Sequence, residues 1–272
     1  MHIQLRRFAG EGRGLNKPFS GALLFLLAVN AAMAQTASAT PRTQYQGKEF
    51  EEAVHAYLIH HPEVVMETIS LYQATQQDAK HQADREAVTR HQAELLTDPN
   101  GAPLNAKDAT VTVVEFFDYR CGYCKKMQST VEKIAVGPTV RIVYKELPIL
   151  GPESLYASKS ALAAFKQGSY EKFHQALMST AEAITPETIE KIAAGLGLNL
   201  SQLKKDMDSP EVSAEIMRNS VLAESLAIEA TPTFVVGREL APGALAEEAL
   251  NSLIDSQRKT QQTVAASGGA SL

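Results

Sequence analysis

Cysteine is scarce in this chain, and long apolar runs are absent from it. Only two cysteines occur among 272 residues, so the sequence allows one intramolecular pair and no disulfide-stapled framework. No uninterrupted apolar stretch reaches the roughly 18 residues of a membrane-spanning helix, which predicts a soluble mature protein. Basic residues are not in excess, because the formal net charge is -5, and nucleic acid is not an expected partner. The length suffices for one full domain and a smaller unit.

The first 34 residues have the layout of a secretory signal. Basic residues, among them Arg6 and Arg7, precede an apolar run over 19–29, and the small residues Ala32 and Ala34 follow it. This order predicts a signal peptide over 1–34 that is cleaved after Ala34, and a mature protein in the periplasm. An uncleaved membrane anchor is the alternative, and the shortness of the apolar run argues against it.

The two cysteines, Cys121 and Cys124, are separated by Gly122 and Tyr123. A disulfide between them closes a ring too short to constrain much of the unfolded chain, so a structural staple explains the spacing poorly. Three interpretations remain: a redox-active dithiol, half of a metal site, and an inert local disulfide. The surrounding sequence favours the redox dithiol.

The cysteine pair lies between an expected strand and an expected helix. The β-branched and aromatic run over 111–117 predicts a buried strand, and 125–136 predicts a helix. A cysteine at a helix N-terminus is favoured as the thiolate, because free backbone N–H groups and the helix dipole stabilise an anion there. Cys121 is therefore the expected nucleophile and Cys124 the expected resolving thiol, while Gly122 and Tyr123 tune the pair and are expected to contact the substrate.

Glu115 is unusual because it is an acid within the apolar strand over 111–117. Burial of a carboxyl group is costly unless it has a partner or a role, and a buried carboxyl with a raised pKa would accept the proton of Cys124 during exchange. The alternative is that Glu115 points to solvent at the edge of the sheet. Asp118 is expected to be only a turn residue.

A proline begins a second expected strand, in the run from Thr231 to Gly237. From this run alone a trans peptide bond is the default, since only about one in twenty X-Pro bonds in folded proteins is cis. Together with the cysteine motif, however, the run resembles the DsbA-like branch of thioredoxin-fold proteins. The resemblance is carried by 116–126 and 231–234 and extends from about Leu96 to Lys259.

This resemblance implies an α/β thioredoxin-like fold with a helical insertion over about 152–226, within a domain spanning 98–260. It implies that Pro232 is cis and packs beside the cysteines, that Thr231 presents its backbone to substrate, and that Glu115 is the buried acid of the fold. The implied activity is thiol-disulfide exchange on unfolded or mis-oxidised exported proteins, with a membrane partner that recycles the dithiol.

Two positions resemble isomerase and reductase members more than strong oxidases. Tyr123 stands where the oxidase type has histidine, and Thr231 where it often has valine. A cationic imidazole stabilises a thiolate and makes the disulfide more oxidising, whereas tyrosine carries no such charge. An isomerase or reductase is therefore expected. The alternatives left open are a dithiol oxidase of exported proteins and a copper-sequestering protein that uses the same two cysteines.

The region over 35–97 has no place in a minimal thioredoxin fold. Apolar residues between Phe50 and Tyr72 recur at helical spacing, and a polar tract follows over 73–91. Residues 50–54 and 57–64 resemble the N-terminal segment of ScsC-type (suppressor of copper sensitivity) proteins, which implies a homo-oligomer, with a trimer favoured. The polar tract is expected to act as a spacer between the oligomerisation segment and each catalytic domain.

No cofactor and no metal site are expected. The histidines show no ligand spacing with either cysteine, so surface or packing roles are favoured for them, and the metal interpretation survives only as Cu(I) held by the Cys121 and Cys124 thiolates. The end of the chain, 261–272, is expected to be a disordered tail after a final helix over 246–256. The histidines considered are His55, His60, His61, His81, His91 and His174.

Overall fold

The computed structural model describes residues 47–97, 109–136 and 139–268, with side chains up to residue 263. The expected signal peptide over 1–34 lies outside these residues. The chain divides into two compact units, one ending at Thr68 and the other beginning at Ile69. In the described residues, no helix is both long and apolar enough to cross a membrane.

The first unit is helical, as expected from its apolar periodicity. Helix α1 spans Lys48–His60, and α2 (Pro62–Arg90) begins within this unit and continues into the second. Pro62 is the first residue of α2, a position at which the missing N–H of proline costs no helical hydrogen bond. None of the α1 residues is buried, and the apolar side chains of the unit that lie exposed are Phe50, Val54, Tyr57, Ile59, Val65 and Met66.

The second unit is built on a four-stranded mixed sheet with the order β2-β1-β3-β4. The central strand β1 (Val111–Phe117) is parallel to β2 (Val140–Glu146) and antiparallel to β3 (Thr233–Val236). The edge strand β4 (Glu239–Pro242) is antiparallel to β3. The strand expected over 111–117 is confirmed, and its central position explains its continuous apolar character.

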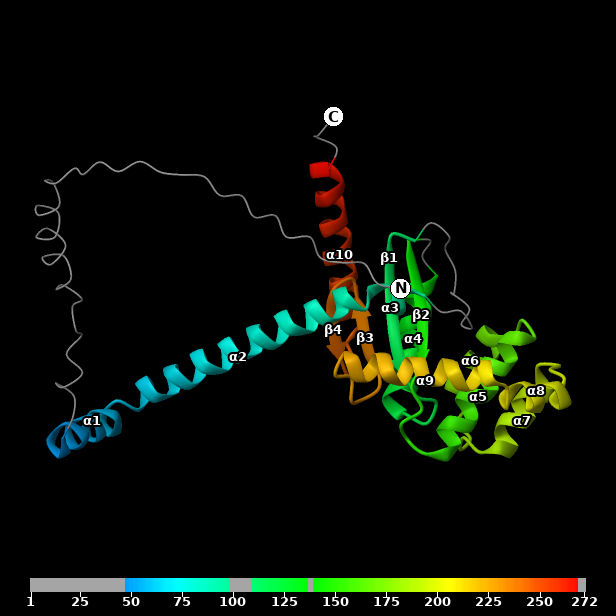
Figure 1. Cartoon of the computed structure of the whole chain (residues 1–272), viewed down its shortest axis with the longest axis horizontal. Coiled ribbons are helices and arrows are strands. Elements are labelled where there is room, and N and C mark those ends of the chain that lie inside the picture. The colour runs from blue at the N-terminus through cyan, green and yellow to red at the C-terminus, as the bar shows by residue number, and fades with distance from the viewer. Residues whose placement is uncertain (1–46, 98–108, 137–138, 269–272) are drawn as a thin grey trace, which may run out of the picture. The chain divides into compact units, whose positions relative to one another are not determined.

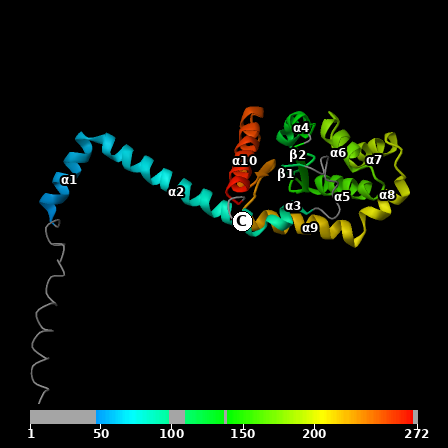
Figure 2. The same ribbon diagram turned by 90° about the horizontal axis from the view of Figure 1, so that it is seen from above.

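The two faces of the sheet are covered by different helices, as Figure 2 shows. One side of β1, with Val111, Val113 and Phe117, packs in the core that includes α4 (Gly122–Ala135) and α10 (Glu247–Gly268). Side chains alternate along a strand, so Val114 and Phe116 face the opposite way. They pack in a second core with the end of α2, α3 (Gln92–Leu96) and α9 (Pro210–Ser225).

Helices alone connect β2 to β3, which confirms the expected helical insertion (Figure 1). Proline begins three of these helices, and the side chains of Thr185, Asn199 and Ser209 each accept a hydrogen bond from the first turn of the helix that follows. Because these caps and prolines are local sequence features, the starts of the helices could be predicted from the sequence. The helices are α5 (Pro152–Lys166), α6 (Tyr170–Ser179), α7 (Pro186–Gly195), α8 (Leu200–Met207) and α9.

The final helix corrects an expectation. A helix ending near Ser256 and a disordered tail over 261–272 were expected, whereas α10 runs to Gly268. No proline or glycine interrupts the chain between these two points, and residues of high helix propensity such as Gln and Ala fill it. The loss of apolar periodicity after Ile254 was therefore no signal for the end of the helix.

Candidate functional site

Cys121 is the N-cap residue of α4, and Cys124 lies in the first turn of this helix. Both cysteines are free thiols. The backbone N–H of Cys124 donates to the Cys121 sulfur at 3.4 Å, and the backbone N–H of Lys125 donates to the Cys121 carbonyl at 3.0 Å. The sulfur of Cys121 thus lies where the unpaired N–H groups of a helix start stabilise a thiolate.

The second motif lies directly against the first. The peptide bond between Thr231 and Pro232 is cis, as the resemblance implies. The Cys121 thiol donates to the carbonyl oxygen of Thr231 at 3.1 Å, although the two residues are far apart in sequence. The structure therefore brings the cis Thr231–Pro232 peptide against the Cys121 sulfur.

Glu115 points into the protein and not to solvent. Its residue is 1% exposed, and in the central strand it is paired with Tyr144 on one side and Phe234 on the other. The alternative of a solvent-facing acid at the sheet edge is therefore wrong. Burial, followed by the charge of Cys121, raises the pKa of Glu115 to about 8. Its Oε2 atom has no hydrogen-bond partner among the described residues.

The two cysteines differ in their surroundings. Cys124 is fully buried, and burial raises the pKa of its thiol well above the usual range. A hydrogen bond from the backbone of Asp118 acts in the opposite direction, and the charge of Glu115 raises this pKa further. Between the cysteines, Tyr123 is 62% exposed, with the Lys126 ammonium 5.2 Å from the centre of its ring. Tyr123 and Gly122 are therefore exposed to solvent between the two buried cysteines.

Asp118 is more than the turn residue expected from the sequence. It is fully buried, and its carboxylate accepts hydrogen bonds from the backbone N–H of Arg120 at 2.8 Å and of Leu150 at 3.0 Å, and from the Ser154 hydroxyl at 2.8 Å. Its carbonyl oxygen accepts from the backbone N–H of Cys121 at 3.0 Å. The turn before the cysteines is thus fixed to the segment that follows β2.

A second buried carboxylate holds the next residue of this turn. Glu146 accepts hydrogen bonds from the hydroxyls of Tyr119 at 3.0 Å, Tyr170 at 2.9 Å and Ser158 at 2.7 Å. The Tyr119 hydroxyl also lies 3.1 Å from Nδ1 of His174. Burial lowers the pKa of His174 to about 3, so the ring is neutral near neutral pH. A packing role for His174 agrees with these contacts, whereas the network itself was not predicted.

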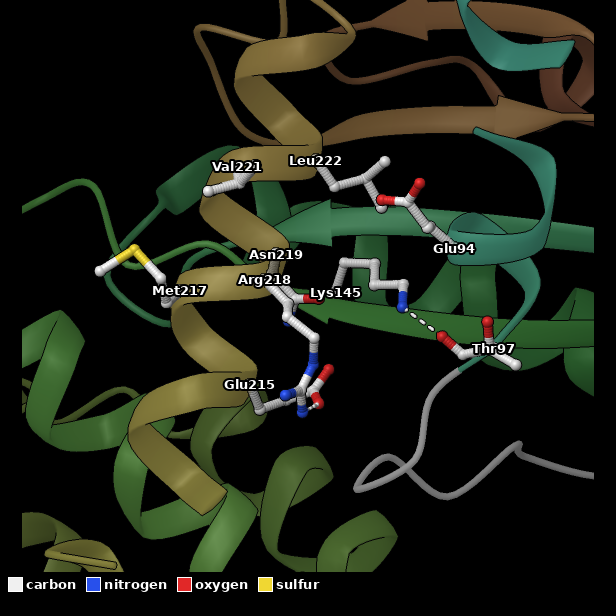
Figure 3. Close-up of a pocket in the computed structure, with 9 residues that line it drawn as sticks. All are labelled: Glu94, Thr97, Lys145, Glu215, Met217, Arg218, Asn219, Val221 and Leu222. Carbon is white, nitrogen blue, oxygen red and sulfur yellow. Dashed lines mark hydrogen bonds and ion pairs between the residues drawn. The ribbon is translucent and has the colours of Figure 1, made fainter. Parts of the chain in front are cut away.

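A cavity of about 450 Å³ lies away from the cysteines, between α9, α3 and the end of β2 (Figure 3). Lys145 lines it and donates from Nζ to the carbonyl oxygen of Thr97 at 2.7 Å. Lys145 alternates along β2 with Tyr144 and Glu146, so it faces away from the cysteine-bearing helix α4. Within the described residues, no group of three or more His, Cys, Asp or Glu side chains is placed to hold a metal ion.

Two family models match the chain. Residues 112–255 match the DSBA-like thioredoxin domain, which includes the sheet, the cysteine motif and the helical insertion. Residues 46–79 match the N-terminal domain of the copper resistance protein ScsC. The first match lies on the thioredoxin-like unit and the second on the N-terminal helices. The sequence pattern distinguishes the same two regions.

Solved structures with this fold include a thioredoxin-like oxidoreductase from Silicibacter pomeroyi. It is 43% identical to this chain with a TM-score of 0.59, and the match covers 61% of this chain and 96% of that one. Proteus mirabilis ScsC is 29% identical with a TM-score of 0.59, over 77% of this chain and 95% of that one. The similarity to ScsC extends beyond the catalytic unit.

Two curated relatives match a smaller share of this chain than these structures do. The probable disulfide bond formation protein D of Bacillus anthracis is 28% identical over 152 residues, which are 51% of this chain and 70% of that one. The Na⁺/H⁺ antiporter NhaA 3 of Salinispora tropica is 29% identical over 151 residues, or 54% of this chain. The chain spans only 23% of the length of that antiporter.

Proposed function

Since this chain belongs to the DsbA-like thioredoxin family, we propose that it is a thiol-disulfide oxidoreductase of exported proteins, and that it acts as a disulfide isomerase or reductase. The observation that carries the proposal is the Cys121 thiol, held at the start of α4 and 3.1 Å from the carbonyl of Thr231. A nucleophilic sulfur and a surface for the substrate backbone are thereby in contact.

The reaction begins when the Cys121 thiolate attacks one sulfur of a substrate disulfide. A bond forms between Cys121 and that sulfur, the substrate disulfide breaks, and the other substrate sulfur leaves as a thiolate. The free N–H groups at the start of α4 stabilise the attacking anion. Thr231 offers a main-chain carbonyl beside the sulfur, so an extended substrate segment binds there through its backbone N–H.

The mixed disulfide is resolved in one of two ways. In reduction, Cys124 attacks Cys121, the Cys121–Cys124 disulfide forms and the substrate leaves with both sulfurs reduced. In isomerisation, a second thiol of the substrate attacks instead, so the substrate is rearranged and Cys121 is released as the thiolate. Both outcomes conserve electrons, and only the first needs a membrane partner to return two electrons to the dithiol.

Reduction requires that Cys124 lose its proton inside the protein. The raised pKa of this thiol means that the proton does not leave unaided near neutral pH. Glu115, whose pKa of about 8 makes it far more basic than an ordinary carboxylate, interacts electrostatically with Cys124 and is the proposed acceptor. Its partnerless Oε2 atom is free to accept that proton directly or through water.

Isomerisation is favoured over oxidation by two features. Tyr123 places no cationic group beside the thiolate, which leaves the disulfide less oxidising than a histidine would. The exposed apolar residues of α1 and of the start of α2 form a surface that copies of this chain would bury against one another. The match of 46–79 to the ScsC N-terminal domain supports a homo-oligomer, which we propose to be a trimer. Several Cys121 sites then face one substrate.

We place this activity in the periplasm, after removal of residues 1–34. The basic and apolar order of these residues supports export, and an oxidising compartment is where mispaired disulfides arise. N-terminal sequencing of the protein purified from a periplasmic extract tests the cleavage after Ala34. A chain that still begins at Met1 contradicts it.

Refolding of scrambled ribonuclease tests the enzymatic proposal. We expect the wild-type protein to restore ribonuclease activity, Cys121→Ala to abolish this effect, and Cys124→Ala to accumulate mixed disulfides that gel electrophoresis detects without reductant. A Cys121→Ala protein that refolds ribonuclease as well as the wild type would show a chaperone-like holdase in place of the enzyme.

A second candidate function is copper sequestration, which the match to a copper resistance family favours. Two thiolates as close as those of Cys121 and Cys124 suit soft Cu(I). Titration of the reduced protein with Cu(I) under a competing chelator tests this candidate, with the protein carrying Cys124→Ser as the control. Equal affinity in both proteins excludes the dithiol as the copper site.

A further inference from the structure

The Asp118 side chain joins three parts of the chain around one buried carboxylate. Its Oδ1 atom accepts from the Arg120 backbone N–H and from the Ser154 hydroxyl, both at 2.8 Å, and its Oδ2 atom accepts from the Leu150 backbone N–H at 3.0 Å. All three contacts are donors, so an acceptor-only carboxylate satisfies them and a side-chain amide does not. The residue is fully buried, which protects these hydrogen bonds from competition with water.

The main chain of the same residue contacts both cysteines. The Asp118 carbonyl oxygen accepts from the backbone N–H of Cys121 at 3.0 Å. Its backbone also hydrogen-bonds the Cys124 sulfur, which lowers the pKa of that thiol against the effect of burial. Asp118 is thus connected to the nucleophile, to the resolving thiol and to the loop after β2.

Arg120 fixes the same loop from its other side. Its Nη1 atom donates to the Leu150 carbonyl at 2.6 Å and to the Glu153 carboxylate at 3.0 Å. The backbone of Gly151 has a φ of +113°, and a Cβ there would lie 3.2 Å from Nη1 of Arg120. Only glycine fits this position without strain. The segment from Leu150 to Ser154, which ends in the first turn of α5, is therefore a rigid support for the turn that carries Asp118.

We propose that Asp118 is a positioning residue: its carboxylate, held by Ser154 and Leu150, fixes the main chain that hydrogen-bonds both cysteines and so sets the dithiol-disulfide equilibrium. This inference rests on the proposed oxidoreductase function and extends it. Forming the Cys121–Cys124 disulfide transfers two electrons and releases two protons to an acceptor disulfide. If the Asp118 main chain moves away from the Cys121 N–H and from the Cys124 sulfur, it stabilises the reduced, partly ionised pair less, so a loss of the Asp118 side-chain contacts favours the disulfide form.

Equilibration with glutathione tests the role of Asp118. We expect Asp118→Asn to shift the equilibrium constant toward the protein disulfide by about tenfold, which equals about 30 mV for a two-electron couple. Ser154→Ala removes a single supporting hydrogen bond and is expected to shift the constant in the same direction by about threefold. Ser160→Ala is the matched control, because Ser160 is equally buried on α5 but bonds the Tyr156 carbonyl and the Met207 sulfur.

The proposal is overturned if the folded Asp118→Asn and Ser154→Ala proteins keep the wild-type constant within about 1.5-fold, which equals about 5 mV for a two-electron couple, whatever their thermal stability. An equal shift in Ser160→Ala overturns it as well. If Asp118→Asn does not fold, Ser154→Ala decides alone. A wild-type protein that forms no disulfide with glutathione is a different result, because it removes the oxidoreductase function itself.

Discussion

The ring of His174 stacks on the ring of Tyr144, with centroids 4.1 Å apart and planes inclined by 30°. Tyr144 is also the β2 residue paired with Glu115 in the central strand. A buried base and a buried acid therefore flank one tyrosine beneath the cysteines. Burial lowers the pKa of His174 to about 3, so this ring is neutral near neutral pH, and it raises that of Glu115 to about 8, so this carboxyl is mostly protonated there and only its ionised fraction accepts a proton.

Glu115 is expected to make the protein less stable at alkaline pH. The folded pKa of about 8 exceeds the ordinary value of 4.5, so the unfolded chain releases this proton first, and stability falls as pH rises from 4.5 to 8. The full effect is on the order of 5 kcal/mol. We predict that Glu115→Gln abolishes the fall between pH 6.5 and 8 in urea unfolding and slows the release of mixed disulfides. An unchanged pH dependence in the variant contradicts a buried, titrating Glu115.

His174 is expected to act in the opposite direction, in acid. Its folded pKa of about 3 lies below the ordinary 6.5, so the unfolded chain binds the proton first and stability is lost as pH falls from 6.5 toward 3. Replacement by Phe keeps the ring stack and removes the titration, although it also removes the contact with the Tyr119 hydroxyl. We predict a His174→Phe protein that is less stable than the wild type at pH 7 but loses less stability between pH 6.5 and 4. Urea unfolding at each pH measures both, and parallel curves for the two proteins would contradict this assignment.

Local sequence signals predicted much of the fold, and distant contacts explain what they missed. The strand over 111–117 and the helices that begin at Pro186 and Pro210 have their periodicity, caps and prolines within a few residues. Asp118 was misjudged because two of its partners, Leu150 and Ser154, are more than thirty positions away. No spacing within the motif encodes hydrogen bonds of that kind.

The site residues likewise differ in whether local sequence alone could identify them. Cys121 and Cys124 could be identified from their spacing and from the strand and helix on either side of them. The burial of Glu115 depends on β1 being central, which requires knowledge that β2 and β3 both pair with it. The network around Glu146 joins β2 to α5 and α6, and its hydroxyl donors resemble ordinary core or surface residues in the sequence. The one feature of the sequence that could have indicated this network is the acidic residue Glu146 in an otherwise largely apolar strand.

Tyr123 is predicted to limit the oxidising strength of the dithiol. A histidine at this position adds a cationic imidazole next to the Cys121 thiolate and stabilises the reduced form. We expect Tyr123→His to raise the redox potential by tens of millivolts and to shift activity from ribonuclease reshuffling toward oxidation of reduced ribonuclease. Tyr123→Phe is the matched control, since it keeps the ring beneath the Lys126 ammonium but adds no charge. A potential that rises equally in both variants would contradict the electrostatic explanation.

The exposed apolar face of α1 is predicted to hold copies of the chain together and, through this, to permit isomerisation. Val54 and Tyr57 lie on this face, 39% and 54% exposed. Lysine at both positions places charge where apolar surface is buried in the proposed oligomer, so we expect Val54→Lys with Tyr57→Lys to give a monomer by light scattering. His55→Lys with Ala56→Lys changes the charge of the same helix off this face and is expected to leave the oligomer intact.

The monomeric variant should still equilibrate with glutathione at the wild-type potential, because the Cys121 site lies wholly within the second unit. Its reshuffling of scrambled ribonuclease should fall several-fold, since a single site meets each substrate. A wild-type protein that is already monomeric, or a monomeric variant with full reshuffling activity, would separate isomerisation from self-association and leave the N-terminal helices with another role.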